Sequence, residues 1–420
     1  MLFSVNHRHL AICGLALAFA VPTYAQSNTP GRITGNEFNP AISFIIDARY
    51  TEIDDDELEI AGFQLGGEAE LPEQGFTTGH NEFAISANVD DKFFGLANTA
   101  IIFEDGETEI ELEEAFVETL TLPAGFTIKA GRFYSNIGYL NTIHDHYHDF
   151  ADRPLVYDAI LGGHLADTGI QTRWVAPTPI YLMLGAELLA GSGFPGGESS
   201  ENNQGLSAFA KTGGDIGDSS SWQFGLSYYQ SDFDVREAGA HAHGGEEEEA
   251  DNELLDGEVE VTGIDFVYKW APQGNSRDRH FKLQAEYFFK KEEGLAELIE
   301  GENSAEALLD GEQQGFYVQA VYQFVPMWRV GLRYDYLNAD NDLSDFESNG
   351  IDAEEFLEES SLVTIDNPQR YSIMFDYSPS HFSRIRMQYS RFDNGFDEET
   401  NDIFMLQYLM SLGSHGTHAF

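Results

Sequence analysis

Apolar and polar residues alternate along the stretch that begins at Phe316. The even positions from 316 to 324 carry Phe, Val, Ala, Tyr and Phe, whereas the odd positions include Gln319 and Gln323. After Pro326 the alternation resumes, again with apolar even positions and with charged residues among the odd ones. A period of two is typical of a β-strand that has one apolar and one polar face. The stretch therefore predicts two strands joined by a tight turn.

The same alternation recurs along the chain and predicts about sixteen strands. Their expected ranges are Ile42–Tyr50, Glu82–Asp90, Phe93–Phe103, Thr108–Leu120, Phe126–Phe133, Gly169–Val175, Ile180–Leu189, Gly205–Thr212, Trp222–Tyr229, Val259–Trp270, Phe281–Phe289, Phe316–Phe324, Trp328–Leu337, Arg370–Tyr377, Phe382–Tyr389 and Ile403–Leu412.

Tight turns alternate with long connections between these strands. Several of the tight turns contain proline, which presets the backbone of a turn. Short turns on one side and long loops on the other are typical of a bacterial outer-membrane barrel, and the strand lengths suit a tilted membrane crossing. We therefore expect an all-β fold, a transmembrane antiparallel β-barrel with long acidic extracellular loops and short periplasmic turns; a large secreted β-sandwich is the alternative. The expected long loops are 53–80, 135–167, 231–258, 290–315 and 338–367.

The N-terminus has the pattern of an export signal. A basic residue, Arg8, precedes an apolar run, and small residues end at Ala25, where we expect cleavage. This divides the chain into a signal peptide (1–25), a short periplasmic segment (26–40) and an outer-membrane β-barrel (41–420). The one cysteine, Cys13, lies in the signal, so the mature chain is expected to have no disulfide. The terminal aromatic Phe420 is the kind of residue that barrel-assembly machinery reads.

Charge and composition narrow the function classes. With 22 Lys and Arg against 72 Asp and Glu, the formal net charge is −50, which disfavours nucleic acid and attracts cations. The 32 Phe and 19 Tyr residues need an apolar surrounding, which lipid and lipopolysaccharide would supply. The sequence has no nucleophile elbow, H-E-x-x-H motif or P-loop, so we expect no enzyme. A homotrimer is one expected assembly.

The segment "IHDHYHDF" (143–150) is the main candidate for metal chemistry. It lies in the expected loop 135–167, which in a barrel with both termini periplasmic would be the third external loop and could fold into the channel. In extended backbone its histidines would point to one face, with successive ones about 6 to 7 Å apart. Imidazole and carboxylate suit Zn²⁺, but a polar loop whose imidazoles bond to acidic neighbours is an equally plain interpretation. The candidate ligands are His144, His146, His148, Asp145, Asp149 and His164, together with His241 and His243 in a later loop.

Charged residues on the polar faces of neighbouring strands predict a pore lining. A basic wall opposite an acidic inward loop would make a transverse field that sorts ions. Alternatively these charges pair with one another and set no selectivity. The candidates are Lys269, Lys282, Glu286, Arg329, Arg333, Asp335, Arg370, Arg384 and Arg386.

The stretch "EEAFVETLTLPAGFTIKAGRFYSNIGYLNTIHDHYHDFADRPLVYDAILGGHLADTGIQTRWVAPT" resembles the phosphate-selective porin family. Together with the ending "MSLGSHGTHAF", it is similar to outer-membrane proteins associated with zinc limitation and often labelled TonB-dependent receptors. The resemblance implies a porin, a zinc connection and an inward third loop. It does not imply a gated transporter, because strand signals that begin at Ile42 leave no room for a plug domain.

These observations predict a porin or channel in the outer membrane of a Gram-negative bacterium. It would pass small solutes with a preference for cations, including divalent metal such as zinc. We expect no required cofactor, and Zn²⁺ only as a transported or loop-bound ion. The alternatives are a general porin without a metal role and a non-conducting surface receptor or adhesin.

Overall fold

The structure is a computed structural model that describes residues 40–413 except 55–57, 105–106, 200–204, 239–250, 301–302, 354–355, 358–359 and 397–399. The expected signal peptide and the terminal Phe420 lie outside the described residues. Within the described residues no helix is long and apolar enough to cross a membrane.

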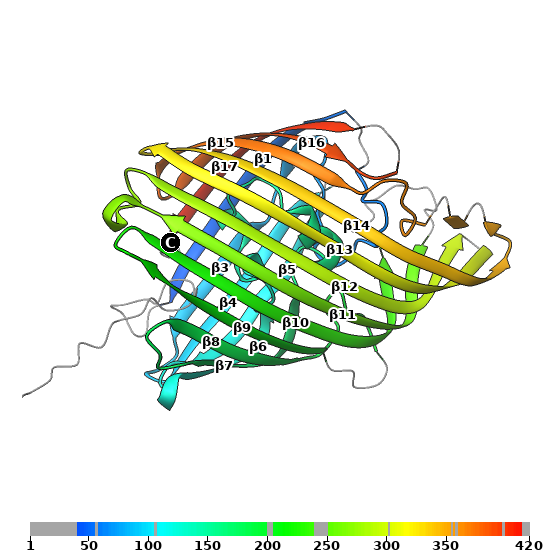
Figure 1. Ribbon diagram of the computed structural model, residues 1–420, viewed down its shortest axis with the longest axis horizontal. Coiled ribbons are helices and arrows are strands. Elements are labelled where there is room, and N and C mark those ends of the chain that lie inside the picture. Colours follow the sequence, from blue (N-terminus) through cyan, green and yellow to red (C-terminus); the bar gives the residue numbers. More distant parts are fainter. Residues whose placement is uncertain are drawn as a thin grey trace, which may run out of the picture.

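In the described part of the chain, seventeen antiparallel strand segments form one closed sheet (Figure 1). They are β1 (Ala41–Ile53), β2 (Gly75–Thr78), β3 (Asn81–Asn88), β4 (Phe93–Glu104), β5 (Glu107–Thr119), β6 (Phe126–Tyr134), β7 (Ala166–Val175), β8 (Tyr181–Leu189), β9 (Gly205–Ile216), β10 (Ser220–Ala238), β11 (Asp251–Trp270), β12 (His280–Glu300), β13 (Asn303–Val325), β14 (Trp328–Asn349), β15 (Gln369–Ser380), β16 (Ser383–Asp393) and β17 (Asn401–Gly413).

The barrel has sixteen strand positions because β2 and β3 share one of them. The segment Ala48–Thr51 of β1 pairs with β2, and the segment Ala41–Phe44 pairs with β3. The other edge of β1 pairs with β17, which closes the sheet. Every strand that the alternation predicts is present, so the predicted fold class is confirmed.

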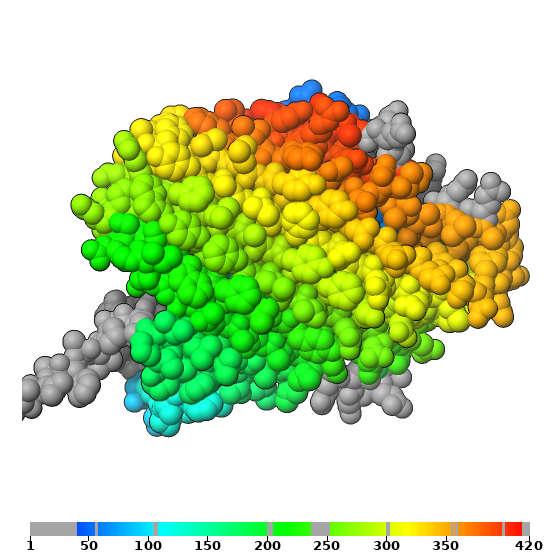
Figure 2. All heavy atoms as spheres, viewed as in Figure 1, coloured from blue at the N-terminus to red at the C-terminus, as the bar shows by residue number. Residues whose placement is uncertain are grey.

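The outer surface of the barrel is apolar where strands would meet lipid. Figure 2 shows this wall as a continuous surface over the green, yellow and orange strands β10 to β16. Apolar side chains that point outward are exposed although the interior is packed, which is the arrangement expected in hydrocarbon and not in water. Examples on these strands are Leu226, Ile264, Val318, Leu332, Ile373 and Ile385.

Three expected loops are strand over part of their length. The ranges 231–258, 290–315 and 338–367 were expected as loops, but β10 to β14 continue far into them, so these expectations are wrong there. Strand β13 shows the cause. Its odd positions face inward throughout, but above the lipid they become apolar, as at Ala305 and Leu309, while even positions such as Asp310 and Glu312 face water. In the membrane the outward face of the strand is apolar, whereas above the membrane the inward face is apolar. The sequence pattern of a lipid-facing strand therefore covers only part of the strand.

Two long loops fill the inside of the barrel. Loop 1 (residues 54–74) and loop 3 (residues 135–165) contribute fully buried side chains, including Phe63, Leu155 and Ile160, to a cluster that also contains Leu309 of β13. Loop 3 carries the seven-residue helix α1 (Leu155–Leu161) and the 3-10 turns η2 (Leu140–Thr142) and η3 (Asp145–Tyr147). Figure 1 shows this loop within the ring of strands.

Candidate functional site: loop 3 and the cavity beside it

Loop 3 is held inside the barrel by charged side chains of the wall. Arg386 donates to the carbonyl oxygens of His148 and Phe150, both at 2.6 Å. Glu286 accepts the backbone N–H groups of Tyr139 and Leu140 at 2.6 and 3.1 Å. Backbone groups that a buried loop would otherwise leave unpaired therefore find partners on the strands.

A second anchor surrounds the carboxylate of Asp152. It accepts hydrogen bonds from Arg333 and Gln388 at 2.7 Å each and forms an ion pair with Arg370 at 2.9 Å. Asp335 bridges the same two arginines. Burial would raise the pKa of Asp152, but the two guanidinium groups outweigh it and lower the pKa to about 2.

Five residues expected to line the pore thus lie against the inserted loop. They are buried side chains that hold the loop, not side chains exposed to a channel, because the loop occupies the space that they face: Glu286, Arg333, Asp335, Arg370 and Arg386.

The other four line a cavity of about 620 Å³ beside loop 3. Lys269, Lys282, Arg329 and Arg384 come from β11, β12, β14 and β16, and Arg277 adds a fifth basic side chain. The cavity also reaches the tight turns around Pro326 and Pro379, so it lies at the short-turn end of the barrel.

Asp149 of loop 3 projects into this basic wall. It forms ion pairs with Lys282 and Arg329, each at 2.7 Å. Burial would raise the pKa of Asp149, but these cations hold it well below its usual range. Asp149, expected as a metal ligand, therefore pairs with fixed cations, away from the histidines of its own segment.

The three histidines of "IHDHYHDF" do not share a face. The expectation of extended backbone is wrong because Asp145–Tyr147 form the 3-10 turn η3. His144 and His146 turn toward strands β3 to β5, whereas His148 turns toward the chain that follows α1.

His144 enters a buried group of three glutamates. Its Nδ1 atom lies 3.3 Å from Glu82 and 3.5 Å from Glu113, and its Nε2 atom lies 3.1 Å from Glu114. Burial would lower the pKa of His144, but these carboxylates raise it well above its usual value. His146 contacts Glu82 at 2.6 Å.

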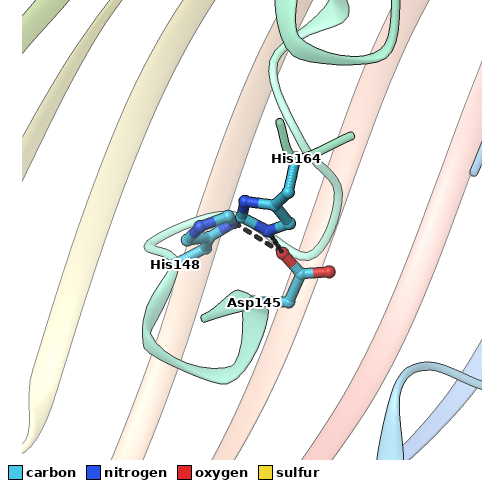
Figure 3. A group of neighbouring side chains, drawn as sticks. All are labelled: Asp145, His148 and His164. Carbon is cyan, nitrogen blue, oxygen red and sulfur yellow. Dashed lines mark hydrogen bonds and ion pairs between the residues drawn. The ribbon is translucent and has the colours of Figure 1, made fainter. Parts of the chain in front are cut away.

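Asp145, His148 and His164 form a second group (Figure 3). The Oδ1 atom of Asp145 lies 3.0 Å from Nε2 of His164 and 3.4 Å from Nδ1 of His148. Burial lowers the pKa of His148 to about 3 despite the nearby carboxylate. Burial would raise the pKa of Asp145, but Arg153 and the histidines hold it well below its usual range.

A third group joins loop 1 to the same carboxylate. Glu70 and His80 each offer a ligand atom near Asp145, and His80 also contacts Glu113 at 3.2 Å. Burial would lower the pKa of His80, but the hydrogen bond to Glu113 and the charge of Glu70 raise it to about 10.

Sequence reasoning missed five members of these groups. Glu70 and His80 lie in or beside an expected loop, and the glutamates Glu82, Glu113 and Glu114 lie on expected strands. The run "ELEEAF" places two adjacent glutamates in one strand, where one would be expected to face lipid. A glutamate predicted to face lipid was the signal in the sequence that something was unusual here. In the structure the register between β4 and β5 shifts at Asn98/Thr99, and both glutamates face the interior. The candidates His241 and His243 lie outside the described residues.

A closed sixteen-position barrel with an apolar outer wall and an inserted third loop defines the porin class of outer-membrane protein. The chain belongs to the family described as phosphate-selective porin O and P, whose model matches residues 43–357. The protein is thus a channel-type barrel of the Gram-negative outer membrane, and family and fold fit a channel for small solutes rather than an enzyme.

Individual proteins agree with this assignment. An uncharacterized protein of Aquifex aeolicus (strain VF5) is 30% identical over 413 residues, which cover 91% of this chain and 80% of the relative. The fold is similar to OprB of Pseudomonas putida, with a TM-score of 0.53, 10% identity, and coverage of 89% of this chain and 94% of that one. It is also similar to an anion-selective porin from Comamonas acidovorans, with a TM-score of 0.51, 9% identity, and coverage of 89% and 99%. The resemblance to a porin family is confirmed; the zinc-limitation resemblance stays a prediction.

Proposed function

We propose that the protein is a passive channel for small solutes and that the cavity beside loop 3 favours small anions. The observation that carries this proposal is the charge of the cavity wall. Five Lys and Arg side chains line it against two Asp side chains, Asp149 and Asp278. A basic constriction with low-dielectric walls raises the local concentration of anions.

Paired charges reduce this effect but leave an excess. Asp149 neutralises part of the charge of Lys282 and Arg329, and Asp376 of β15 also pairs with Arg329. Arg384 donates to the carbonyl oxygen of His148, which leaves its positive charge uncompensated by that bond. Lys269 lies near the ring of Tyr139, with 5.8 Å between the ammonium nitrogen and the ring centroid. The family is named for phosphate, which is an anion, and the excess of positive charge on the cavity wall would attract anions.

Cation passage, including divalent metal, is the second candidate. It is supported by the formal net charge of −50 and by the buried groups of histidine and carboxylate above the cavity. The two candidates differ in which part of the path limits flow. Acidic loops would concentrate cations at the mouth, whereas the basic cavity would oppose their passage further in.

Planar bilayers under a KCl gradient test both candidates. We expect the purified protein to conduct and the reversal potential to have the sign of an anion-preferring pore. The double variant Lys269→Gln, Lys282→Gln should shift this potential toward cations. The matched control Lys291→Gln should not, because Lys291 is half exposed and pairs with Glu312 outside the cavity.

Each contrary result has a distinct meaning. Folded protein that carries no current would refute the channel and favour a surface receptor or adhesin. A current with a cation-type reversal potential would refute the role of the cavity and favour the second candidate.

A further inference from the structure

The group of Asp145, His148 and His164 has the spacing of a metal site. The three ligand atoms lie within 4.8 Å of one another, and two nitrogens approach one carboxylate oxygen at 3.0 and 3.4 Å (Figure 3). Zinc takes His nitrogen and carboxylate oxygen at about 2.0 to 2.2 Å in a tetrahedron, so neighbouring ligand atoms lie about 3.3 Å apart. The side chains therefore need little movement to hold one ion.

Hydrogen bonds on the far side of each ring select the tautomer that binds metal. Nε2 of His148 lies 2.8 Å from the carbonyl oxygen of Ile143, and Nδ1 of His164 lies 3.1 Å from that of Asn141. A carbonyl oxygen only accepts, so each of these nitrogens carries a proton. In a neutral ring the opposite nitrogen then presents a lone pair. Histidines that bind metal are oriented in this way by backbone carbonyls.

With these tautomers and both rings neutral, two nitrogen lone pairs point at one carboxylate oxygen of Asp145, at 3.0 and 3.4 Å. A cation placed among these three atoms would contact all of them at once.

The carboxylate is itself held in place. Arg153 contacts both oxygens of Asp145, with Nε at 3.1 Å from Oδ1 and Nη2 at 2.7 Å from Oδ2. Arg153 also donates to the carbonyl oxygen of Glu68 in loop 1. Ligating carboxylates commonly have such partners, which fix their orientation.

The mixture of ligands indicates which ions would bind. Imidazole with carboxylate suits Zn²⁺, Ni²⁺ or Cu²⁺, whereas Ca²⁺ and Mg²⁺ prefer oxygen ligands throughout. The position of the group in the chain indicates a consequence. Asp145 and His148 precede α1 and His164 follows it, so one ion would join the two ends of the helical part of loop 3.

We infer that Asp145, His148 and His164 bind one divalent transition-metal ion that clips loop 3 in its inward position. The inference goes beyond the proposed channel function and does not depend on it, because the ion is assigned to the loop and not to the transported solute.

Metal titration of the full chain, refolded in detergent, tests the site. Zinc binding is measured by calorimetry on wild type and on the double variant His148→Gln, His164→Gln. His146→Gln is the matched control, because this histidine belongs to the same loop but contacts Glu82 instead. His144→Gln reports on the neighbouring group with Glu82 and Glu113.

We expect one zinc ion per chain in wild type. The double variant should bind at least about 100-fold more weakly, since even the loss of an outer partner of a ligand costs about 10- to 100-fold. The control should bind like wild type. Equal affinity of the double variant and wild type would overturn the inference, as would a loss confined to His144→Gln.

A second measurement uses wild type alone, so that it tests the site even if the double variant does not fold. Co²⁺ is added to wild type, and its visible spectrum reports coordination. An intense band of four-coordinate Co²⁺ is expected, whereas the weak spectrum of six oxygen ligands would overturn the inference. Neither readout uses ion current, so failure of the proposed channel function is distinguishable from failure of the metal site.

Discussion

Replacement of Asp152 by Ala should release loop 3 from the barrel wall. The side chain is buried and contacts Arg333, Arg370 and Gln388 at 2.7 to 2.9 Å. Loss of one partner from a buried ion pair costs about 3 to 5 kcal/mol, because the other charge stays buried and uncompensated. Asp335 lies 2.9 Å from Arg333 and 3.5 Å from Arg370 and still compensates part of their charge. We therefore expect a cost at the low end of this range.

A cost of about 3 kcal/mol reduces the equilibrium constant for loop docking by roughly 10². Hydrogen–deuterium exchange across residues 135–165 should then accelerate by about that factor in Asp152→Ala, and single-channel current should become larger and noisier. Asp152→Asn should fall between this variant and wild type, because the amide can still accept hydrogen bonds but carries no charge. The control Asp310→Asn changes an exposed carboxylate of β13 and should leave loop exchange unchanged.

The lowered pKa of Asp152 makes the docking of loop 3 depend on pH. This pKa is about 2 in the folded protein, below the usual value of about 3.9 in an unfolded chain. A lowered pKa stabilises the fold above the unfolded value, and this contribution is lost as the pH falls toward 2. The difference in loop exchange between wild type and Asp152→Asn should therefore be constant above about pH 4 and shrink between pH 4 and 2. Unchanged exchange in a folded Asp152→Ala barrel at neutral pH would refute the anchoring role.

Three further substitutions probe other parts of the barrel. Gly138→Ala should destabilise loop 3 by about 1 to 3 kcal/mol, because φ is +63° there and a Cβ would lie 2.5 Å from a carboxylate oxygen of Glu286; exchange of residues 135–165 reports it. Leu309→Ala should cost about 2 to 5 kcal/mol in urea unfolding, because this buried residue packs the part of β13 above the lipid, and a smaller cost would mean that the extension is loosely packed. Leu332→Arg should cost about 2 to 4 kcal/mol in lipid vesicles, since this side chain is exposed on the outer wall, and a neutral result would place it outside the hydrocarbon.

The barrel could be predicted because its information is local. Alternation in a stretch such as 316–324 reflects lipid on one side and the interior on the other, and each strand carries that record by itself. The sequence stopped predicting strand where the apolar side chains change from the outer face of the strand to its inner face. Above the lipid, Asp310 faces water and Leu309 faces the packed loops, so the alternation persists with its faces exchanged.

The chemistry of loop 3 was only partly visible in the sequence. The sequence by itself determined that histidines and carboxylates are concentrated in one inward loop, and it identified Asp145, His148 and His164 as candidates. Only the tertiary structure decided their grouping. The 3-10 turn at Asp145–Tyr147 separates His144 and His146 from His148, and α1 returns the chain so that His164 meets Asp145. Contacts between residues far apart in the chain depend on how the loop packs against the barrel wall. No local sequence pattern determines which of these residues meet.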